Sequence, residues 1–281
     1  MTTHDRRDTT LAALDALAAQ RSLPAGTRVR VHLVDAGSTD GTAETVRRAH
    51  PGVQVTVVGA DVRWGEGMRL ASRNSRAAGL AEPTHQLWLD DDVLLAPDAL
   101  AQLLGVSAAL DEEAVVVGAV RHRGATVHSG RRRHGRALAL VEPDGTPEPC
   151  DTYDGDVVLL PWGVRERVGD IDKVFRHGMG DYDHGFRARR AGVPAYVAPR
   201  HVGDRHVAHR PAGPASAPFG SREPVIGVRA ALRRRSPAPD LPVRQWWVYC
   251  WRHTGLRAPL LMVAPYVVTV IRAVPTGRTT P

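Results

Sequence analysis

The segment HQLWLDDD, residues 85–92, joins a short apolar run to three consecutive aspartates. Such a run is typical of a buried strand, and Asp90, Asp91 and Asp92 follow directly at its carboxyl end. In open α/β sheets, ligands bind in the crevice outside the carboxyl ends of the strands. A divalent cation that bridges to a phosphate would relieve the repulsion between these carboxylates, although they could instead cap the helix expected after Pro97. We therefore expect a strand followed by a candidate metal site.

Short β-branched runs alternate with helical patterns on both sides of this segment. The alternation is typical of a mostly parallel sheet covered by helices, so we expect the α/β fold class. The expected strands are residues 28–35, 53–58, 85–89, 114–120 and 195–198, with a further one in DGDVVLLP (154–161). The expected helices are residues 9–20, 43–49, 65–78, 98–110, 162–168 and 183–191.

Two regions lack this periodicity. In residues 121–149 glycine, arginine and proline dominate, so we interpret the region as an excursion from the fold or a flexible loop, which borders a site and is a candidate lid. Residues 210–240 hold many of the 21 prolines and are interpreted as a linker or an extended arm. We therefore expect two domains, 1–209 and 210–281.

The tail after this linker joins arginines to three tryptophans, followed by an apolar run broken by Pro259 and Pro265. A membrane-spanning helix needs about 20 apolar residues, and this run is shorter. Two interpretations remain open. The tail is either an interfacial helix pair that rests on anionic lipid, or a C-terminal helix that packs on the domain.

Composition excludes several classes of protein. The 281 residues are 43% hydrophobic, which rules out global disorder and is enough to fill a sizeable core. The two cysteines lack Cys-x-x-Cys spacing, which excludes a disulfide framework and a zinc site of that type. Residues 1–20 lack the apolar core of a secretory signal, so we expect a cytoplasmic protein. The net charge of +7 favours anionic partners such as nucleotides, nucleic acid or acidic lipid head groups.

A second motif, VDAGSTDGT (34–42), comes at the end of the strand expected at 28–35. Asp35 could accept hydrogen bonds from a base or ribose there, and Gly37 permits close approach of a ligand to the backbone. The same residues also fit an ordinary turn followed by a helix cap. The motif alone therefore leaves both interpretations open.

A third motif, HGMGDYDHGFRARRAG (177–192), opens the helix expected at 183–191. The helix dipole favours carboxylates at a helix N-terminus, so Asp181 and Asp183 have a structural explanation. A general base must stand at the mouth of a cleft on a rigid element, and Asp181 also meets that description.

In this order and spacing, the three motifs resemble those of the family 2 glycosyltransferases, which are nucleotide-diphospho-sugar transferases with the GT-A fold. The resemblance covers residues 2–206, and the segment WGEGMRLA (64–71) is similar to that of rhamnosyltransferase-like bacterial members. It implies a GT-A, Rossmann-like, mostly parallel sheet flanked by helices in residues 1–209. Residues 210–281 would then form a proline-rich linker and a basic, aromatic helical extension.

The resemblance also implies roles for individual residues. Asp181 would be the catalytic base, with Gly180 where many members have glutamate. A divalent metal, Mg²⁺ or Mn²⁺, would be held by Asp92 and by a downstream histidine, for which His201, His206 and His209 compete and we favour His206. The nucleotide-sugar would be bound by Thr3, Asp35, Gly37, Arg69, Asp90 and Asp91.

The function that the resemblance implies is inverting transfer of a sugar, with rhamnose as a candidate, from a UDP- or dTDP-linked donor. The acceptor would be a hydroxyl of a glycan or of a polyprenyl-linked glycan in cell-wall or surface polysaccharide synthesis. The basic, aromatic tail would suit peripheral contact with the inner face of the cell membrane. The alternative is an inactive transferase-like protein that binds an anionic partner, nucleic acid or lipid, although nucleic acid is not expected.

A nicotinamide-dependent oxidoreductase is a weaker rival. It would need Gly-x-Gly-x-x-Gly after the first strand, whereas GEGMRL at Gly65 follows a later strand and lacks the third glycine.

The chain departs from the family pattern at its start. Members have a buried strand before the loop that cups the base, and here that loop would be Thr3-His4-Asp5-Arg6, with Met1 where the strand should be ending. We therefore expect the first strand to be missing, leaving its two neighbours without ladder partners. A native start upstream of Met1 would explain this, and mass spectrometry of the natural N-terminus would test it.

Overall fold

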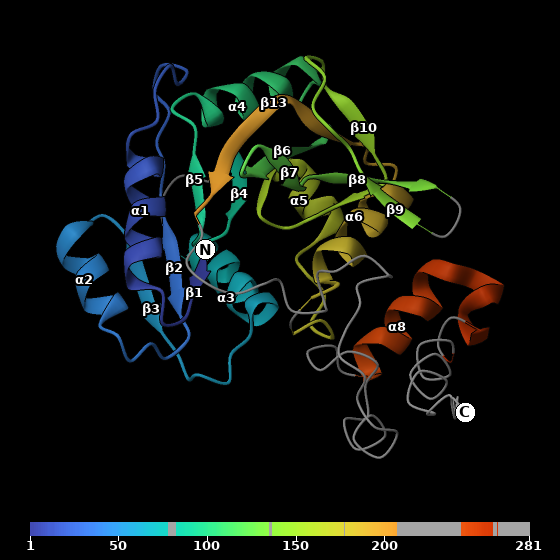
Figure 1. Ribbon diagram of the computed structural model, residues 1–281, viewed down its shortest axis with the longest axis horizontal. Helices are drawn as coiled ribbons and strands as arrows, with labels where there is room; N and C mark the ends of the chain where they lie inside the picture. The colour runs from blue at the N-terminus through green and yellow to red at the C-terminus, as the bar shows by residue number, and fades with distance from the viewer. Residues whose placement is uncertain (78–82, 135–136, 177, 207–242, 261–262, 264–281) are drawn as a thin grey trace, which may run out of the picture. The chain divides into compact units, whose positions relative to one another are not determined.

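The computed structural model describes residues 1–77, 83–134, 137–176, 178–206, 243–260 and 263 (Figure 1). The chain divides into two compact units, one made of 1–176 with 180–209 and the other of 177–179 with 210–281. The domain assignment expected from the sequence, 1–209 and 210–281, stays a prediction. The expected linker at 210–240 lies outside the described residues.

The chain begins with a small parallel sheet in the order β1-β2-β3. Helix α1 contacts α2 and β5, and its buried Leu14 and Leu17, spaced as expected for one face of a helix, share one hydrophobic core with Leu33 of the sheet. The elements are β1 (Thr2–Thr3), α1 (Arg7–Ala18), β2 (His32–Asp35), α2 (Thr42–Ala49), β3 (Gln54–Val57) and α3 (Trp64–Ala77).

A larger sheet has the strand order β10-β13-β6-β12-β4. Strand β12 is antiparallel to both β4 and β6, while β13 is parallel to β6, so β4, β6 and β13 share one direction. The mixed α/β fold with a mostly parallel central sheet is therefore confirmed. Its elements are β4 (His85–Leu89), β5 (Val93–Leu95), α4 (Ala99–Ala109), β6 (Val115–His122), β12 (Val157–Pro161), α5 (Trp162–Val168), α6 (Gly180–Arg190) and β13 (Ala195–Arg205).

The antiparallel direction of β12 decides where the site forms. Val157, at the start of β12, lies opposite Leu89, at the end of β4. The residues just before β12 therefore meet the residues just after β4. The main-chain N–H of Asp90 donates to the carbonyl of Asp156 at 2.9 Å, which fixes the two turns together.

The expectation of a flexible loop at 121–149 is wrong. Four strands form there, and β8 pairs with β9 and with β11 in a small antiparallel sheet while β7 pairs with β6. Apolar alternation does not mark β8, because Arg131 takes an inward position and makes an ion pair with the buried Asp154. The four strands are β7 (Ala125–His128), β8 (Gly130–His134), β9 (Ala137–Leu140) and β10 (Glu148–Cys150), and β11 (Thr152–Tyr153) follows directly after the region.

The first strand is shortened rather than missing, which corrects the expectation from the sequence. In β1, Thr2 and Thr3 pair with β2, and the amino group of Met1 donates to the carbonyl of His32 at 3.1 Å. Among the described strands β1 pairs only with β2, and β4 pairs only with β12. Of the two strands expected to lie beside the first strand, β2 therefore pairs with β1, and β4 does not.

The second unit contains α8 (Val243–Thr254) and the short 3-10 helix η1 (Gly255–Arg257). Trp246 and Tyr249 stack on one face of α8, whereas Trp247 and Trp251 are 45% and 71% exposed. Within the described part of the chain, no helix has the length and apolar character needed to cross a membrane.

Candidate active site

The first wall of the site is the acidic turn after β4. Asp91 and Asp92 are only 5% and 6% exposed, and Arg6 reaches both from the loop after β1, with Nη1 at 2.9 Å from Asp91 Oδ1 and 3.2 Å from Asp92 Oδ2. Asp90 is less buried and its Oδ1 accepts a hydrogen bond from Nε1 of Trp64 at 2.8 Å. The three aspartates singled out in the sequence therefore line one edge of the sheet.

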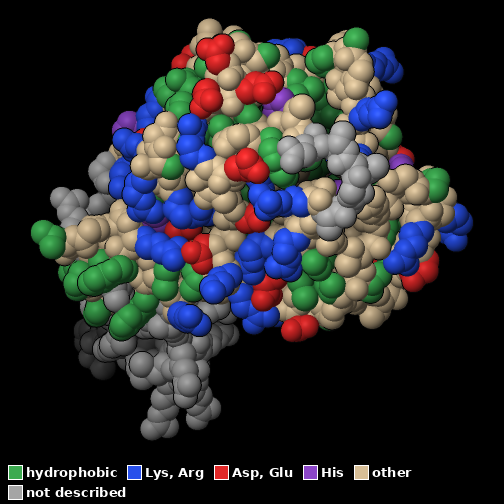
Figure 2. All heavy atoms as spheres, turned by 180° about the vertical axis from the view of Figure 1, so that it is seen from behind, with side chains coloured by type: hydrophobic (Ala, Val, Ile, Leu, Met, Phe, Trp, Pro, Cys, Tyr) green, Lys and Arg blue, Asp and Glu red, His purple; other side chains and the backbone are tan. Residues whose placement is uncertain are grey.

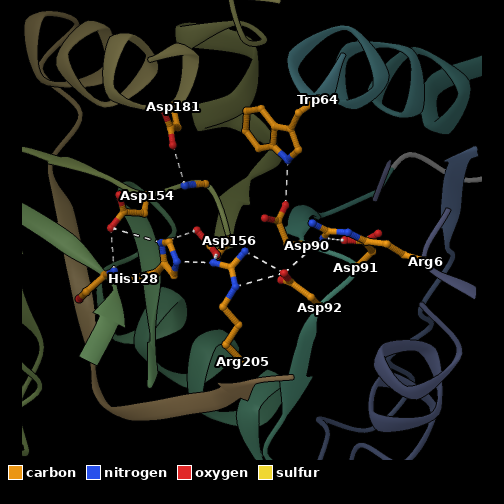
Figure 3. A network of polar contacts seen from close by, with 12 residues as sticks. Arg6, Trp64, Asp90, Asp91, Asp92, His128, Asp154, Asp156, Asp181 and Arg205 are labelled. Carbon is orange, nitrogen blue, oxygen red and sulfur yellow. Dashed lines mark hydrogen bonds and ion pairs between the residues drawn. The ribbon is translucent and has the colours of Figure 1, made fainter. Parts of the chain in front are cut away.

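The second wall is the segment Asp154-Gly155-Asp156, which the sequence analysis treated only as the lead into a strand. Carboxylate oxygens of Asp90, Asp92 and Asp156 lie within 4.8 Å of one another (Figure 3). Asp92 Oδ1 is buried and has no hydrogen-bond partner among the described residues. An oxygen-rich set with an unpartnered buried carboxylate atom fits a hard divalent cation such as Mg²⁺ or Mn²⁺.

The net charge of the cluster of acidic and arginine side chains around Asp92 also fits a divalent cation. Burial, reinforced by neighbouring carboxylates, raises the pKa of Asp90 and of Asp156. When every carboxyl group is ionised, the cluster has an excess of two negative charges, the charge that one divalent cation supplies. Its members are Asp90, Asp91, Asp92, Asp156, Arg6 and Arg205.

His128 and Arg131 complete the second wall from the strands at 121–149. His128 Nδ1 lies 3.1 Å from Asp156 Oδ2, and burial lowers the pKa of His128 to about 4, so the ring is neutral near pH 7. Arg131 Nε donates to Asp154 at 3.0 Å, and the hydroxyl of Tyr182 donates to the same carboxylate at 2.7 Å. These contacts fix the position of the Asp154 carboxylate and leave Asp156 to face the first wall.

Asp181 lies in the first turn of α6, against Gly155. Its Oδ2 accepts the Gly155 N–H at 3.1 Å and its Oδ1 accepts the Tyr182 N–H at 2.9 Å. Burial raises the pKa of Asp181 to about 6. A Cβ on Gly155 would lie 2.6 Å from the ring of Trp64 and 3.3 Å from Cβ of Asp181, so both side chains lie against this glycine.

Three of the residues expected to bind the nucleotide lie in β1, at the end of β2 or just after it: Thr3, Asp35 and Gly37. Asp35 is buried, and its Oδ1 accepts the Ser38 N–H at 2.9 Å, which closes the turn after β2. Thr3 lies opposite Asp35 in the β1–β2 ladder. Gly37 has φ +69°, and a Cβ there would lie 2.8 Å from the Ala60 nitrogen, so the turn requires glycine. Their nucleotide-binding roles stay predictions.

Arg69 and His206 are placed differently from the other expected site residues. Nη1 of Arg69 donates to the carbonyls of Asp172 and Phe175, both at 3.2 Å, so this side chain holds the loop before α6 against α3. The main-chain N–H of His206 donates to the Asp92 carbonyl at 2.7 Å, while its side chain is exposed. His201 pairs with Thr126 at 2.8 Å. The competing His209 lies outside the described residues, and the choice of His206 as a metal ligand stays a prediction.

Residues 1–148 match the family model described as glycosyl transferase family 2. The chain belongs to this family. A curated relative of this family 2 glycosyltransferase is the N-acetylglucosaminyl-diphospho-decaprenol L-rhamnosyltransferase of Mycobacterium tuberculosis. The two are 24% identical over 226 residues, which cover 70% of this chain and 72% of the relative.

Solved structures share the fold of this family 2 glycosyltransferase. A mannosyltransferase of Pyrobaculum calidifontis in complex with GDP-Man and Mn²⁺ matches with a TM-score of 0.55 and 18% identity, covering 97% of this chain and 71% of that one. TarS residues 1–349 of S. aureus in complex with UDP-GlcNAc matches with a TM-score of 0.52 and 14% identity, covering 98% and 80%.

Proposed function

We propose that this chain is an inverting, metal-dependent glycosyltransferase that uses a nucleotide-diphospho-sugar donor. One observation carries the proposal: Asp181, whose pKa is raised to about 6, lies beside Trp64, and Trp64 donates to Asp90 in the carboxylate cluster. A base and a candidate cation site are thus joined by one aromatic side chain. This arrangement suits attack on a sugar whose leaving group is a diphosphate.

In the proposed reaction, the Asp181 carboxylate takes the proton of the acceptor hydroxyl as that oxygen attacks the anomeric carbon. The bond between the anomeric carbon and the diphosphate oxygen breaks, and the diphosphate leaves with the electron pair. A divalent cation held by Asp90, Asp92 and Asp156 would supply positive charge for the leaving diphosphate. The raised pKa suits a base that must be ionised near neutral pH and yet bind a proton.

The relative suggests the substrate class. Its name describes rhamnosyl transfer to a GlcNAc-diphospho-decaprenol acceptor. We propose rhamnose from a dTDP- or UDP-linked donor as the first sugar to test, and a polyprenyl-linked glycan as the acceptor, in cell-wall or surface polysaccharide synthesis. The roles of Thr3, Asp35, Gly37 and Arg69 in holding the nucleotide belong to the same proposal.

The surface of α8 supports a peripheral position at the inner face of the cell membrane. Trp247, Val248, Trp251 and Arg252 line an apolar groove with a volume of about 280 Å³. Exposed tryptophans beside arginines are typical of helices that rest at a lipid interface.

The surface charges favour the enzyme over a protein that only binds an anionic partner. On the face shown in Figure 2, basic side chains gather over the middle and acidic side chains lie among and around them. Several exposed arginines have acidic partners: Arg167 with Glu113, Arg176 with Glu66, Arg189 with Asp151 and Arg200 with Asp98. Paired arginines offer less charge to nucleic acid than unpaired ones.

Thermal denaturation with UDP, dTDP and GDP, each with and without Mn²⁺, tests the donor class. A ligand that binds only the folded protein raises its melting temperature. We expect a rise with one nucleotide that requires Mn²⁺, followed by transfer from the matching sugar donor to GlcNAc-diphospho-polyprenol. Salt-sensitive binding to RNA or anionic vesicles, without any nucleotide effect or transfer, would favour the inactive alternative.

A further inference from the structure

Arg205 lies between two of the carboxylates that would hold the cation. It is the last residue of β13 and pairs with Val93, which directly follows Asp92. Its Nη2 and Nε lie 2.8 and 3.1 Å from Asp92 Oδ2, and its Nη1 lies 3.1 Å from Asp156 Oδ1. The guanidinium therefore bridges the two walls of the site (Figure 3).

These contacts use the oxygen atoms that a divalent cation would need. Asp92 Oδ2 already accepts from Arg205 and from Arg6, while the second oxygen of Asp156 faces His128. In the part of the chain that the structure describes, Asp92 Oδ1 has no hydrogen-bond partner. A cation bound by both Asp92 and Asp156 would lie close to the guanidinium and repel it, because both carry positive charge.

We propose that Arg205 is an internal counter-cation, which holds Asp92 and Asp156 together when the divalent cation is absent and is displaced when that cation binds. This inference rests on the metal site of the proposed function. Arg205 is a positioning residue in this scheme. Arg205 holds the acidic side chains in place before the metal binds. It also lowers the affinity of the site for metal, because the metal must displace the guanidinium.

The test measures binding of Mn²⁺ alone, without donor, from the electron paramagnetic resonance signal of the free ion. We expect Arg205→Met to bind Mn²⁺ about tenfold more tightly than the wild type, equivalent to about 1.4 kcal/mol. Without metal, the same variant should melt at a lower temperature than the wild type, and Mn²⁺ should raise its melting temperature by more.

Arg121→Met is the matched control. Arg121 of β6 pairs at 2.8 Å, on an exposed surface, with Asp204, the residue before Arg205, so its loss removes the same charge beside the same end of β13. We expect its Mn²⁺ affinity to equal that of the wild type. If Arg205→Met binds Mn²⁺ no more tightly than the wild type, or if Arg121→Met tightens binding equally, displacement of Arg205 is refuted.

Asp92→Asn separates this inference from the proposed function. Mn²⁺ binding that Asp92→Asn leaves unchanged would refute the metal site itself, and the role of Arg205 with it. Mn²⁺ binding that Asp92→Asn removes but Arg205→Met does not strengthen would refute only the displacement of Arg205.

Discussion

Replacement of Asp181 by asparagine should abolish transfer and stabilise the protein at the same time. Burial raises the pKa of Asp181 from its ordinary value of 3.8 to about 6. A change of that size corresponds to about 3 kcal/mol, an upper limit because the side chain is only partly enclosed. The folded protein therefore keeps a carboxylate that would be more stable in water.

The pH dependence has a definite sign. Between the two pKa values the folded state binds more protons at this site than the unfolded state, so the wild type loses stability as the pH rises from about 4 to about 6. Asparagine does not titrate. The variant and the wild type should be similar near pH 4, and above about pH 7 the variant should be more stable by up to about 3 kcal/mol. Other acidic groups titrate in both proteins and cancel in the difference.

Urea unfolding of both proteins across this pH range gives the stability difference, and product chromatography gives the transfer rate. Asp144→Asn is the control, because Asp144 is exposed and hydrogen bonds from Thr146 lower its pKa, so this variant should gain no stability with rising pH. A stability difference for Asp181→Asn that stays constant with pH would refute the raised pKa. Transfer that persists in the variant would refute its role as the base.

Three further predictions concern packing, a buried ion pair and the membrane surface. Gly67→Ala should cost about 1–3 kcal/mol in urea unfolding, because a Cβ there would overlap Oγ1 of Thr2, whereas Gly105→Ala meets nothing within 4 Å and should not destabilise. Arg131→Met should cost about 3 kcal/mol in the same assay, because it leaves the buried carboxylate of Asp154 without its ion-pair partner. Trp251→Ser should weaken sedimentation with anionic vesicles, since this side chain is 71% exposed; unchanged sedimentation would contradict the lipid contact.

The sequence predicted the first wall of the site well, because local signals define it. An apolar run, Leu-Trp-Leu at residues 87–89, followed by charge predicts a strand end, and β4 indeed ends at Leu89. The helix that carries Asp181 was also expected from acidic residues that favour a helix N-terminus, although α6 begins at Gly180, three residues before the expected start at 183. In both places the decisive residues are neighbours in the sequence, so no knowledge of the tertiary structure was needed.

The second wall could not be predicted in the same way, because the composition of a strand does not determine whether it runs parallel or antiparallel to its neighbours. A mostly parallel sheet would place the start of β12 at the opposite edge from the end of β4. The antiparallel pairing brings Asp154 and Asp156 to the acidic turn instead. The signal available was the DGD triplet before a strand, which repeats the acidic pattern of residues 90–92.

Arg205 was missed for a related reason. The expected strand ended at Ala198, because Pro199 reads as a stop. In the structure β13 continues to Arg205, with irregular register against β6 between Val197 and His201 that accommodates the proline. Only this continuation carries the guanidinium to Asp92.

Strands β1 and β4 belong to different sheets, and we expect the division between these sheets to affect how the protein opens. Met1, Leu33 and Leu89 share one core across the division, and Arg6 reaches Asp91, but the described strands form no hydrogen-bonded ladder there. Side-chain contacts can separate without breaking a ladder of hydrogen bonds, so we expect the layer of β1, β2 and β3 to open before the rest of the domain. Amide hydrogens in β2 should therefore exchange with solvent through partial opening, while those in β6 and β12 exchange only when the whole domain unfolds.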